Sequence, residues 1–239
     1  MKILITICAR GGSKGIPGKN IKPLNGIPLI EYTITKAFKF AQKKDVVVAL
    51  STDDEDILKI SRSAGLNTYY KRPKKLAQDD TGKQETIKDV LLYQESLLNE
   101  KFDFILDLDV SSPLRSKEDL TRSFNTFLNN KESLSLFSVN NSHRNPYFNM
   151  VEEGKSGYFN LVKIPETNIL SRQKAPKVYD LNASFYWYRR SFFNDNYETP
   201  VTEKSLVFLT DHICFDLDHQ NDFDYMEYLI QNEKLDFKL

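Results

Sequence analysis

The sequence has little that is typical of secreted, membrane-spanning or nucleic-acid-binding proteins. It contains two cysteines, Cys8 and Cys214, and its 33 basic and 33 acidic residues give a formal net charge of +0. So few cysteines argue against a disulfide framework, and both lie in apolar runs that favour reduced core residues. Balanced charge argues against general binding to nucleic acids or membrane surfaces. No apolar run is long enough to cross a bilayer, so we expect a cytoplasmic protein.

Two common phosphate-binding motifs are also missing, although residues 2–20 have the properties of a phosphate site. A short apolar run ends in a loop with four glycines, two lysines and one arginine. A Walker A motif would have glycine in place of Ser13 and a hydroxyl residue in place of Asn20, and the dinucleotide fingerprint is absent. Buried strands that end in such loops bring backbone N–H groups and cations to the ligand-binding edge of α/β sheets. The sequence therefore predicts a nucleoside triphosphate site, with a basic surface turn as the alternative.

The spacing of apolar residues predicts an α/β protein with a mostly parallel central sheet. Ser116 and either Thr52 or Asp53 are expected to cap two of the helices. Residues 141–182 break the alternation of strands and helices. They are rich in aromatic residues, which suit an interface or a sugar-binding surface, and they include an expected hairpin at 148–162. We expect strands at residues 3–9, 46–50, 67–71, 102–110, 134–139, 183–188, 207–209 and 213–218, and helices at 29–41, 53–64, 84–98, 117–128 and 221–232.

Two pairs of carboxylates lie near the ends of expected strands. Asp107 and Asp109 share one side of a buried strand, where two charges need a cation, a metal or hydrogen-bond donors. Asp216 and Asp218 alternate in the same way on a late strand. They suit magnesium, which takes few carboxylates together with phosphate oxygens and water. The alternative for each pair is a solvated strand end.

Five short motifs follow one another along nearly the whole chain. They are Ala9-Arg10-Gly11-Gly12-Ser13-Lys14-Gly15-Ile16-Pro17-Gly18-Lys19-Asn20, Ser51-Thr52-Asp53, Arg72-Pro73-x-x-Leu76-Ala77, Ser112-Pro113-Leu114-Arg115 and Phe215-Asp216-Leu217-Asp218. Each motif is weak alone, but together they resemble the acylneuraminate cytidylyltransferases, the family of CMP-sialic acid synthetases. The stretches that begin at Arg144 and Arg172 are most similar to the branch that activates legionaminic acid, a bacterial sialic acid analogue.

The resemblance implies a Rossmann-like nucleotidyltransferase that uses Mg²⁺ to convert CTP and a nonulosonic acid, N,N'-diacetyllegionaminic acid, to a CMP-sugar and pyrophosphate. It implies a homodimer, in which residues 1–140 and 183–239 form the nucleotide-binding catalytic domain and 141–182 a dimerisation and sugar-binding excursion. By motif, the catalytic residues would be Lys19, Asp216, Asp218 and Arg10. The nucleotide would be bound by Arg10, Gly11, Gly12, Ser13, Lys19, Asn20, Arg72 and Lys83. The sugar would be contacted by Asp109, Arg172, Gln173 and Tyr186, and the metal would be held by Asp216 and Asp218.

Three residues depart from the pattern of many sialic acid enzymes. Asp109 stands where they have a glutamine that helps to hold the sugar, Asp180 where they often have an arginine, and Lys83 where a serine often contacts the nucleotide. The departures at Asp109 and Asp180 favour a sugar other than that of the sialic acid enzymes. Two alternative activities stay open: a CMP-N-acetylneuraminate synthetase, and a nucleotidyltransferase that acts on a sugar phosphate, which shares the glycine-rich first loop and a late metal carboxylate. A non-catalytic nucleotide-binding protein is the alternative from another class.

Overall fold

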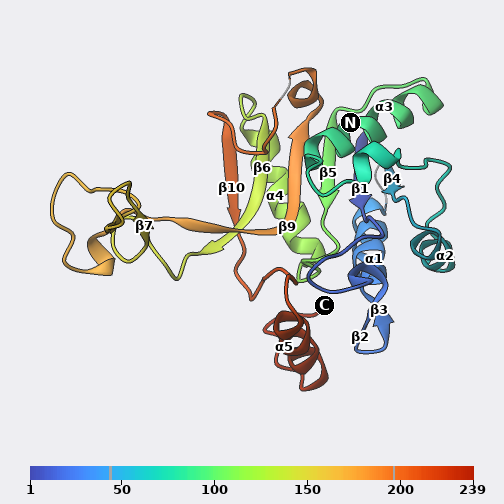
Figure 1. The fold of residues 1–239 in the computed structure, drawn as a ribbon. Coiled ribbons are helices and arrows are strands. Elements are labelled where there is room, and N and C mark those ends of the chain that lie inside the picture. Colours follow the sequence, from blue (N-terminus) through green and yellow to red (C-terminus); the bar gives the residue numbers. More distant parts are fainter. Residues whose placement is uncertain (43–44, 196) are drawn as a thin grey trace.

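A six-stranded central sheet organises the computed structural model, which describes residues 1–42, 45–195 and 197–239. The strand order is β10-β6-β9-β5-β1-β4, and all neighbours are parallel except that β9 runs antiparallel to β5 and β6 (Figure 1). The predicted α/β fold with a mostly parallel sheet is therefore confirmed. The sheet strands are β1 (Ile3–Cys8), β4 (Val46–Ser51), β5 (Phe104–Leu108), β6 (Ser135–Asn141), β9 (Tyr179–Arg189) and β10 (Ser205–Leu209), and the helices are α1 (Leu29–Ala41), α2 (Glu55–Ser63), α3 (Lys83–Leu98), α4 (Lys117–Asn129) and α5 (Gln220–Gln231).

Buried clusters lie on both faces of the sheet, and the side chains of β1 alternate between them. Ile3, Ile5 and Ile7 pack in one cluster with residues of α1, α2, α4 and α5, whereas Leu4 packs in the other with residues of α3. A continuous apolar run is what a strand buried on both faces requires. Burial thus fixes the strand from which the glycine-rich loop begins. None of the helices in the described part of the chain is long and apolar enough to cross a membrane.

The strand predicted at residues 67–71 is wrong, because this segment has no regular secondary structure. Its Thr68 hydroxyl donates to the carbonyl oxygen of Leu50 in β4 at 3.4 Å. A side chain therefore occupies a backbone acceptor that a neighbouring strand would use. Just after this segment, the backbone amide of Arg72 donates to the carbonyl oxygen of Thr52 at 3.1 Å. The segment therefore runs beside β4 without forming a ladder of backbone hydrogen bonds.

The strand predicted at residues 213–218 is also wrong, because this segment is irregular. The carbonyl oxygen of Cys214 accepts a hydrogen bond from the side-chain amide of Asn140 at 2.8 Å, so a side chain replaces a strand partner. Asp216 and Asp218 consequently do not alternate on a strand. Instead, Asp216 is partly buried and Asp218 is exposed.

The helix caps are partly as predicted. Ser116 caps α4, and its hydroxyl accepts from the Asp119 amide while the Asp119 carboxylate accepts from the Ser116 amide, which completes a capping box. The cap predicted for α2 is wrong by one or two residues. Asp54 fills this place, because its carboxylate accepts from the first free amides of the helix, and neither Thr52 nor Asp53 does so.

Residues 142–178, here called the arm, project away from the sheet between β6 and β9 (Figure 1). The predicted hairpin is present within it, as the antiparallel strands β7 (Val151–Glu153) and β8 (Phe159–Leu161). β6 and β9 remain paired as far as Asn141 and Tyr179, with a register shift between Phe137 and Val139, so the arm begins where this paired ladder ends. The division into a catalytic domain and an excursion at residues 141–182 stays a prediction.

Candidate active site

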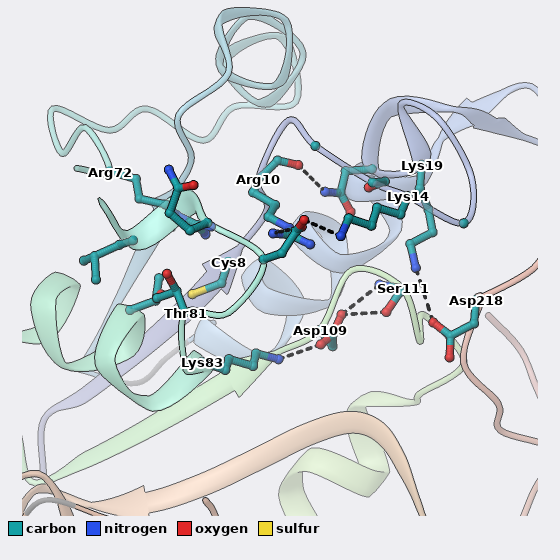
Figure 2. A pocket seen from close by; sticks show the side chains of 18 residues that line it. Cys8, Arg10, Lys14, Lys19, Arg72, Thr81, Lys83, Asp109, Ser111 and Asp218 are labelled. Carbon is teal, nitrogen blue, oxygen red and sulfur yellow. Dashed lines mark hydrogen bonds and ion pairs between the residues drawn. The ribbon is translucent and has the colours of Figure 1, made fainter. Parts of the chain in front are cut away.

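A pocket of about 380 Å³ opens beside the carboxyl ends of β1 and β5 (Figure 2). Open α/β sheets bind their ligands at this edge. One wall is the glycine-rich loop after β1, and another is the segment that runs from Arg72 into α3. Asp109 and Ser111, which follow β5, and Asp218, which precedes α5, complete the lining. The pocket thus brings together parts of the chain that are far apart in sequence.

Two hydrogen bonds hold the glycine-rich loop in place. The side-chain amide of Asn20 donates to the carbonyl oxygen of Arg10 at 2.9 Å, which ties the end of the loop to its beginning. The backbone amide of Gly11 donates to the Asp53 carboxylate at 3.1 Å, which ties the loop to the segment after β4. Hydrogen bonds within the protein therefore anchor both ends of the loop.

Lys19 joins the glycine-rich loop to the segment that carries Asp218. Its ammonium donates to the Leu217 carbonyl oxygen at 2.5 Å and lies 3.7 Å from the Asp218 carboxylate. Gly15 packs so closely against the Asp218 carbonyl that even a Cβ atom would collide with it. A cation and a carboxylate therefore face the same pocket from adjoining walls.

Asp79 bridges the two other cations of the glycine-rich loop. Its carboxylate lies 2.5 Å from the Lys14 ammonium and 2.8 Å from the Arg10 guanidinium. Hydrogen bonds from Lys14 and then from Arg10 lower the pKa of Asp79. Two cations that converge on one carboxylate have the geometry to bind another anion in its place.

Arg72 and Cys8 form part of the pocket wall. Arg72 is buried because its guanidinium donates to the hydroxyl of Ser51 at 2.9 Å and to the carbonyl oxygen of the same residue at 2.8 Å. Burial, together with Asp107, raises the pKa of the Cys8 thiol to about 12. Since the thiolate is the nucleophilic form of cysteine, Cys8 is not suited to covalent catalysis at neutral pH.

The carboxylates of Asp107 and Asp109 meet a cation, as one of the sequence-based alternatives predicts. The Lys83 ammonium lies 2.7 Å from the Asp107 carboxylate and 2.5 Å from that of Asp109. Burial opposes the charge on Asp109, but Lys83 outweighs burial and lowers the pKa of this carboxyl to about 2. Asp109 is therefore ionised at neutral pH.

Asp216 and Asp218 fit a divalent cation. One oxygen of Asp216, Oδ1, is buried and has no hydrogen-bond partner among the described residues. Burial, followed by the charges of Asp109 and Asp218, raises the pKa of Asp216 to about 6. A cation beside the pair would satisfy the unpaired oxygen and offset the repulsion. The described residues hold no cluster of three or more histidine, cysteine or acidic ligands, but magnesium needs few carboxylates when phosphates and water supply the rest.

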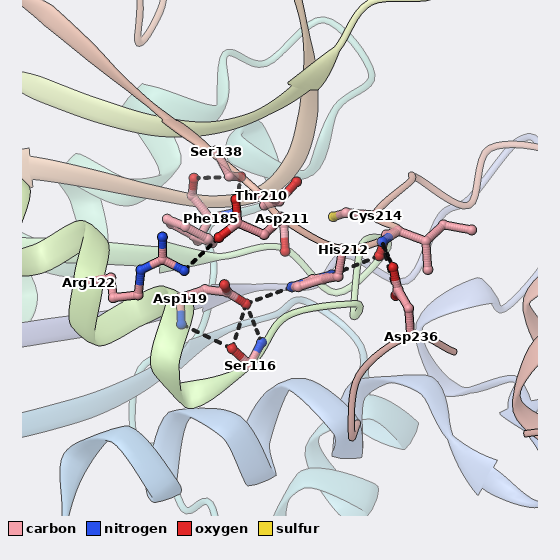
Figure 3. Close-up of polar contacts among 12 residues, drawn as sticks. Ser116, Asp119, Arg122, Ser138, Phe185, Thr210, Asp211, His212, Cys214 and Asp236 are labelled. Atoms are coloured by element: carbon pink, nitrogen blue, oxygen red, sulfur yellow. Dashed lines mark hydrogen bonds and ion pairs between the residues drawn. The ribbon is translucent and has the colours of Figure 1, made fainter. Parts of the chain in front are cut away.

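A partly buried histidine supports the segment that carries these two carboxylates (Figure 3). The imidazole of His212 lies 2.7 Å from the Asp119 carboxylate and stacks on the ring of Phe237, with a centroid distance of 3.9 Å. Burial opposes protonation of His212, but Asp119 outweighs it and raises the pKa of the imidazole. Burial likewise opposes ionisation of Asp119, but His212 and Ser116 lower the pKa of its carboxyl.

The pH dependence of stability tests this contact. The His212 contribution is complete below about pH 6.5, where the unfolded histidine is protonated too, and it declines as the pH rises through the higher folded pKa. The Asp119 contribution is complete above about pH 4 and declines as the pH falls through the lower folded pKa. We expect His212→Gln to lose about 1 kcal/mol more unfolding free energy at pH 6 than at pH 9 in urea titrations. An equal loss at both pH values would contradict a charged pair.

The structure brings most, but not all, of the predicted site residues into the pocket, and their roles stay predictions. Arg172 and Gln173 instead line a separate cavity of about 570 Å³ at the base of the arm. The ring of Tyr186 on β9 lies 5.2 Å from the Lys83 ammonium. The pocket is lined by Arg10, Gly12, Ser13, Lys19, Asn20, Arg72, Lys83, Asp109 and Asp218, whereas Gly11, Asp216, Arg172, Gln173 and Tyr186 are outside its lining.

Several lining residues have no role in the sequence-based prediction. Lys14, Asp79, Thr81 and Ser111 all contribute to the pocket. Lys14 belongs to the glycine-rich motif, so its position and charge are enough to predict that it lines the pocket. Asp79 and Thr81 lie in a polar loop that follows a predicted strand, where ligand contacts are common, but nothing local singles them out.

The mixed α/β fold with its mostly parallel sheet is also that of solved nucleotidyltransferases. The structure is similar to a solved CMP:2-keto-3-deoxy-manno-octonic acid synthetase complexed with CTP, with a TM-score of 0.68 and 17% identity over 98% of this chain and 100% of that chain. It is also similar to 4-diphosphocytidyl-2C-methyl-D-erythritol synthase from Anaerococcus prevotii, with a TM-score of 0.64 and 15% identity over 96% of each chain. At such identities the likeness shows the fold alone.

The chain belongs to the cytidylyltransferase family, whose model matches residues 4–237. Post-translational flagellin modification protein B of Campylobacter coli is 38% identical, over 99% of this chain and 98% of that protein. The CMP-N,N'-diacetyllegionaminic acid synthase of Campylobacter jejuni is 37% identical, over 98% of this chain and 97% of that protein. These relatives confirm the predicted family and its legionaminic acid branch.

Proposed function

We propose that this protein transfers the cytidylyl group of CTP to a nonulosonic acid, N,N'-diacetyllegionaminic acid, and releases pyrophosphate. The observation that carries the proposal is the pocket itself, which is lined by three cations of the glycine-rich loop, Arg10, Lys14 and Lys19, and by the carboxylate of Asp218. Three cations on one loop suit a triphosphate. The full-length relative from Campylobacter jejuni bears the name of this activity and supports the choice of acceptor.

The reaction is an in-line displacement at the α-phosphorus of CTP. The anomeric hydroxyl of the sugar forms the new P–O bond, and the bond to pyrophosphate breaks. Such transfers depend mainly on positioning and on stabilisation of charge. Arg10, Lys19 and the amide groups of the glycine-rich loop would bind the triphosphate and offset charge on the departing pyrophosphate. A carboxylate of the Asp216 and Asp218 pair is suited to accept the hydroxyl proton.

Asp216 and Asp218 would hold a magnesium ion, as the unpaired buried oxygen of Asp216 supports. When bound, the ion would neutralise phosphate charge and favour ionisation of the attacking hydroxyl. The free cysteines Cys8 and Cys214 suit a reducing compartment, and we place the protein in the cytoplasm.

A panel of acceptors tests the proposed activity. The protein is incubated with CTP, magnesium and one of three acids: N,N'-diacetyllegionaminic, N-acetylneuraminic or pseudaminic acid. We expect the highest kcat/KM for the legionaminic acid, measured by pyrophosphate release, with a CMP-sugar of matching mass. Pyrophosphate release that requires a sugar phosphate, and that none of the 2-keto acids supports, would contradict the proposal.

The contacts of Asp79 give a prediction for CTP binding. Its carboxylate forms ion pairs with Arg10 and Lys14, two cations that the triphosphate would need. Binding must therefore break these ion pairs. Because Asp79 is exposed, each pair contributes little, and we expect Asp79→Asn to tighten CTP binding by about two- to fivefold in isothermal titration calorimetry.

The neighbouring Asp80 supplies a matched control. It is also exposed, and it lies outside the pocket lining. Asp80→Asn removes the same charge from the same loop, so a general effect of charge would tighten CTP binding equally in both variants. Weaker binding in Asp79→Asn would show that the carboxylate assists the nucleotide instead of competing with it.

The arm supports a homodimer. Its two predicted sugar contacts, Arg172 and Gln173, line a cavity separate from the pocket of their own chain. A second copy of the chain would bring an arm to each pocket and cover its apolar surface. Sedimentation equilibrium should show a dimer, and a monomer at micromolar concentration would contradict this. The exposed apolar residues of the arm include Val151, Tyr158, Phe159, Ile164 and Leu170.

A further inference from the structure

A charged bridge under the pocket joins the first residue of α3 to the end of β5. Asp107 is fully buried, and one of its carboxylate oxygens accepts from the hydroxyl of Thr6 at 2.8 Å. Its other oxygen lies 2.7 Å from the Lys83 ammonium, which also lies 2.5 Å from the Asp109 carboxylate. These three residues, Asp107, Lys83 and Asp109, are here called the Lys83 bridge. One cation between two carboxylates leaves the bridge with one net negative charge.

The surroundings of Lys83 indicate that its ammonium positions other groups of the protein and does not contact a ligand. An ammonium has three N–H donors. Asp109 accepts from one of them, and the Asp107 carboxylate forms an ion pair with the ammonium at 2.7 Å. The ring of Tyr186, 5.2 Å away, covers a further side. The two carboxylates outweigh burial and raise the pKa of Lys83 well above its usual value. Lys83 is thus a permanent charge whose partners are within the protein.

The carboxylate of Asp109 is held from two sides and keeps one free direction. Its Oδ2 atom binds Lys83, and its Oδ1 atom accepts from the backbone amide of Ser111 at 3.0 Å and from the Ser111 hydroxyl at 2.9 Å. A carboxylate accepts about four hydrogen bonds. Asp109 lines the pocket, so a ligand with a hydrogen-bond donor is suited to fill the remaining position.

The charge of the bridge indicates which ligand group it meets. A net negative charge repels phosphates, which the cations Arg10, Lys14 and Lys19 attract elsewhere in the pocket. Asp109 also lies close to the segment of Asp216 and Asp218, because Ser111, whose backbone amide donates to the Asp109 carboxylate, accepts a hydrogen bond from the backbone amide of Leu217 at 2.9 Å. It therefore lies beside the pair that we assign to the reacting centre, where the acceptor sugar must enter. Amide N–H and hydroxyl groups are the donors that such a sugar carries.

Stability alone does not explain the bridge. Two buried carboxylates with one ammonium are expensive to desolvate, and apolar residues of similar volume are often as stable or more so. A bridge that lines a pocket and carries unbalanced charge is better explained by recognition of a ligand.

We propose that Lys83, anchored by Asp107, is a positioning residue that fixes the Asp109 carboxylate beside the reacting centre, where it selects acceptor sugars that offer an amide or hydroxyl hydrogen. The proposal rests on the proposed function, because it assumes that the pocket joins CTP to a sugar. It predicts that Lys83 affects the binding of the acceptor sugar, through Asp109, and does not affect the binding of CTP.

Steady-state kinetics with CTP and N,N'-diacetyllegionaminic acid test the proposal. Lys83→Met leaves the buried Asp107 carboxylate without its cation, so the double variant Lys83→Met with Asp107→Asn is made in parallel to keep the fold. In the double variant and in Asp109→Asn we expect the KM for the acid to rise about tenfold to a hundredfold, the range of one charge-assisted hydrogen bond. The affinity for CTP, measured by calorimetry without the acid, should stay within about twofold, which is our expectation for a residue without CTP contact.

Lys83→Arg is the matched conservative variant. Its guanidinium can still bridge two carboxylates, so the KM for the acid should stay within severalfold of that of the unaltered protein. If Lys83 had a purely structural role, its loss would weaken the binding of CTP and of the acid by similar factors. Equal weakening of CTP and acid, or an unchanged KM for the acid in the folded double variant, would overturn the proposal. If the unaltered protein itself releases no pyrophosphate with any nonulosonic acid, the proposed function fails first, and with it this inference.

Discussion

Lys19→Met lowers kcat/KM for CTP by about a hundredfold to a thousandfold, the usual effect of removing one donor that stabilises developing charge. The reason lies in the position of the ammonium. It is largely buried between the glycine-rich loop and the segment of Asp218, and it donates to the Leu217 carbonyl oxygen at 2.5 Å. A cation there adjoins both the triphosphate and the carboxylates of the reacting centre. Methionine keeps most of the apolar length of the side chain, with one heavy atom fewer, and removes the charge and its donors.

Lys22 offers a control three residues further along the chain. Its ammonium also connects the region of the glycine-rich loop to α5, because it lies 2.7 Å from the side-chain oxygen of Gln220 and 4.5 Å from the ring of Phe223. Lys22 does not line the pocket. We expect Lys22→Met to retain kcat/KM within about threefold, the size of a lost exposed contact. Equal losses of kcat/KM in the two variants would mean that Lys19 only holds the glycine-rich loop to the segment of Asp218.

Asp216→Asn is expected to lower kcat by about a thousandfold while it raises the melting temperature. The two effects have one cause. The carboxylate is partly buried, one of its oxygens is unpaired, and Asp109 and Asp218 repel it. An amide removes that repulsion from the folded state, so stability rises, but it also removes a ligand from the proposed metal site. Steady-state kinetics and thermal unfolding of the same preparation measure both effects.

Asp211 supplies the control for that experiment. It belongs to the same irregular segment, it is exposed, and it pairs with Arg122 at 2.7 Å outside the pocket. Asp211→Asn should leave kcat unchanged and should not raise the melting temperature. If Asp216→Asn lost stability together with kcat, the carboxylate would be holding the segment in place, and the case for a metal ligand would fail.

The features that the sequence predicts well are those encoded locally. The apolar run of β1 and the glycines and cations that follow it are contiguous, and this region forms a buried strand that opens into the pocket. The capping box of α4 depends on Ser116 and Asp119, which are three residues apart. Patterns of this length need no knowledge of the rest of the fold, which is why they survive in the structure.

The features that the sequence does not predict depend on residues far apart. Residues 213–218 alternate like a strand, but the distant Asn140 occupies one of their carbonyl oxygens. The partner of Asp107 and Asp109 is Lys83, more than twenty positions earlier in the chain. Asp79 meets the glycine-rich loop only because the loops at one edge of the sheet converge. Such pairs are set by topology, and no local pattern encodes them.

Transfer of an ¹⁸O label from the acceptor tests the proposed reaction most directly. The protein is given CTP, magnesium and N,N'-diacetyllegionaminic acid that carries ¹⁸O in its anomeric hydroxyl, and the products are followed by ³¹P NMR and mass spectrometry. Attack of this hydroxyl on the α-phosphorus predicts that the label lies in the phosphodiester of the CMP-sugar, with an equal amount of unlabelled pyrophosphate. Label in pyrophosphate or in free phosphate, or the absence of a CMP-sugar while CTP is consumed, would contradict it.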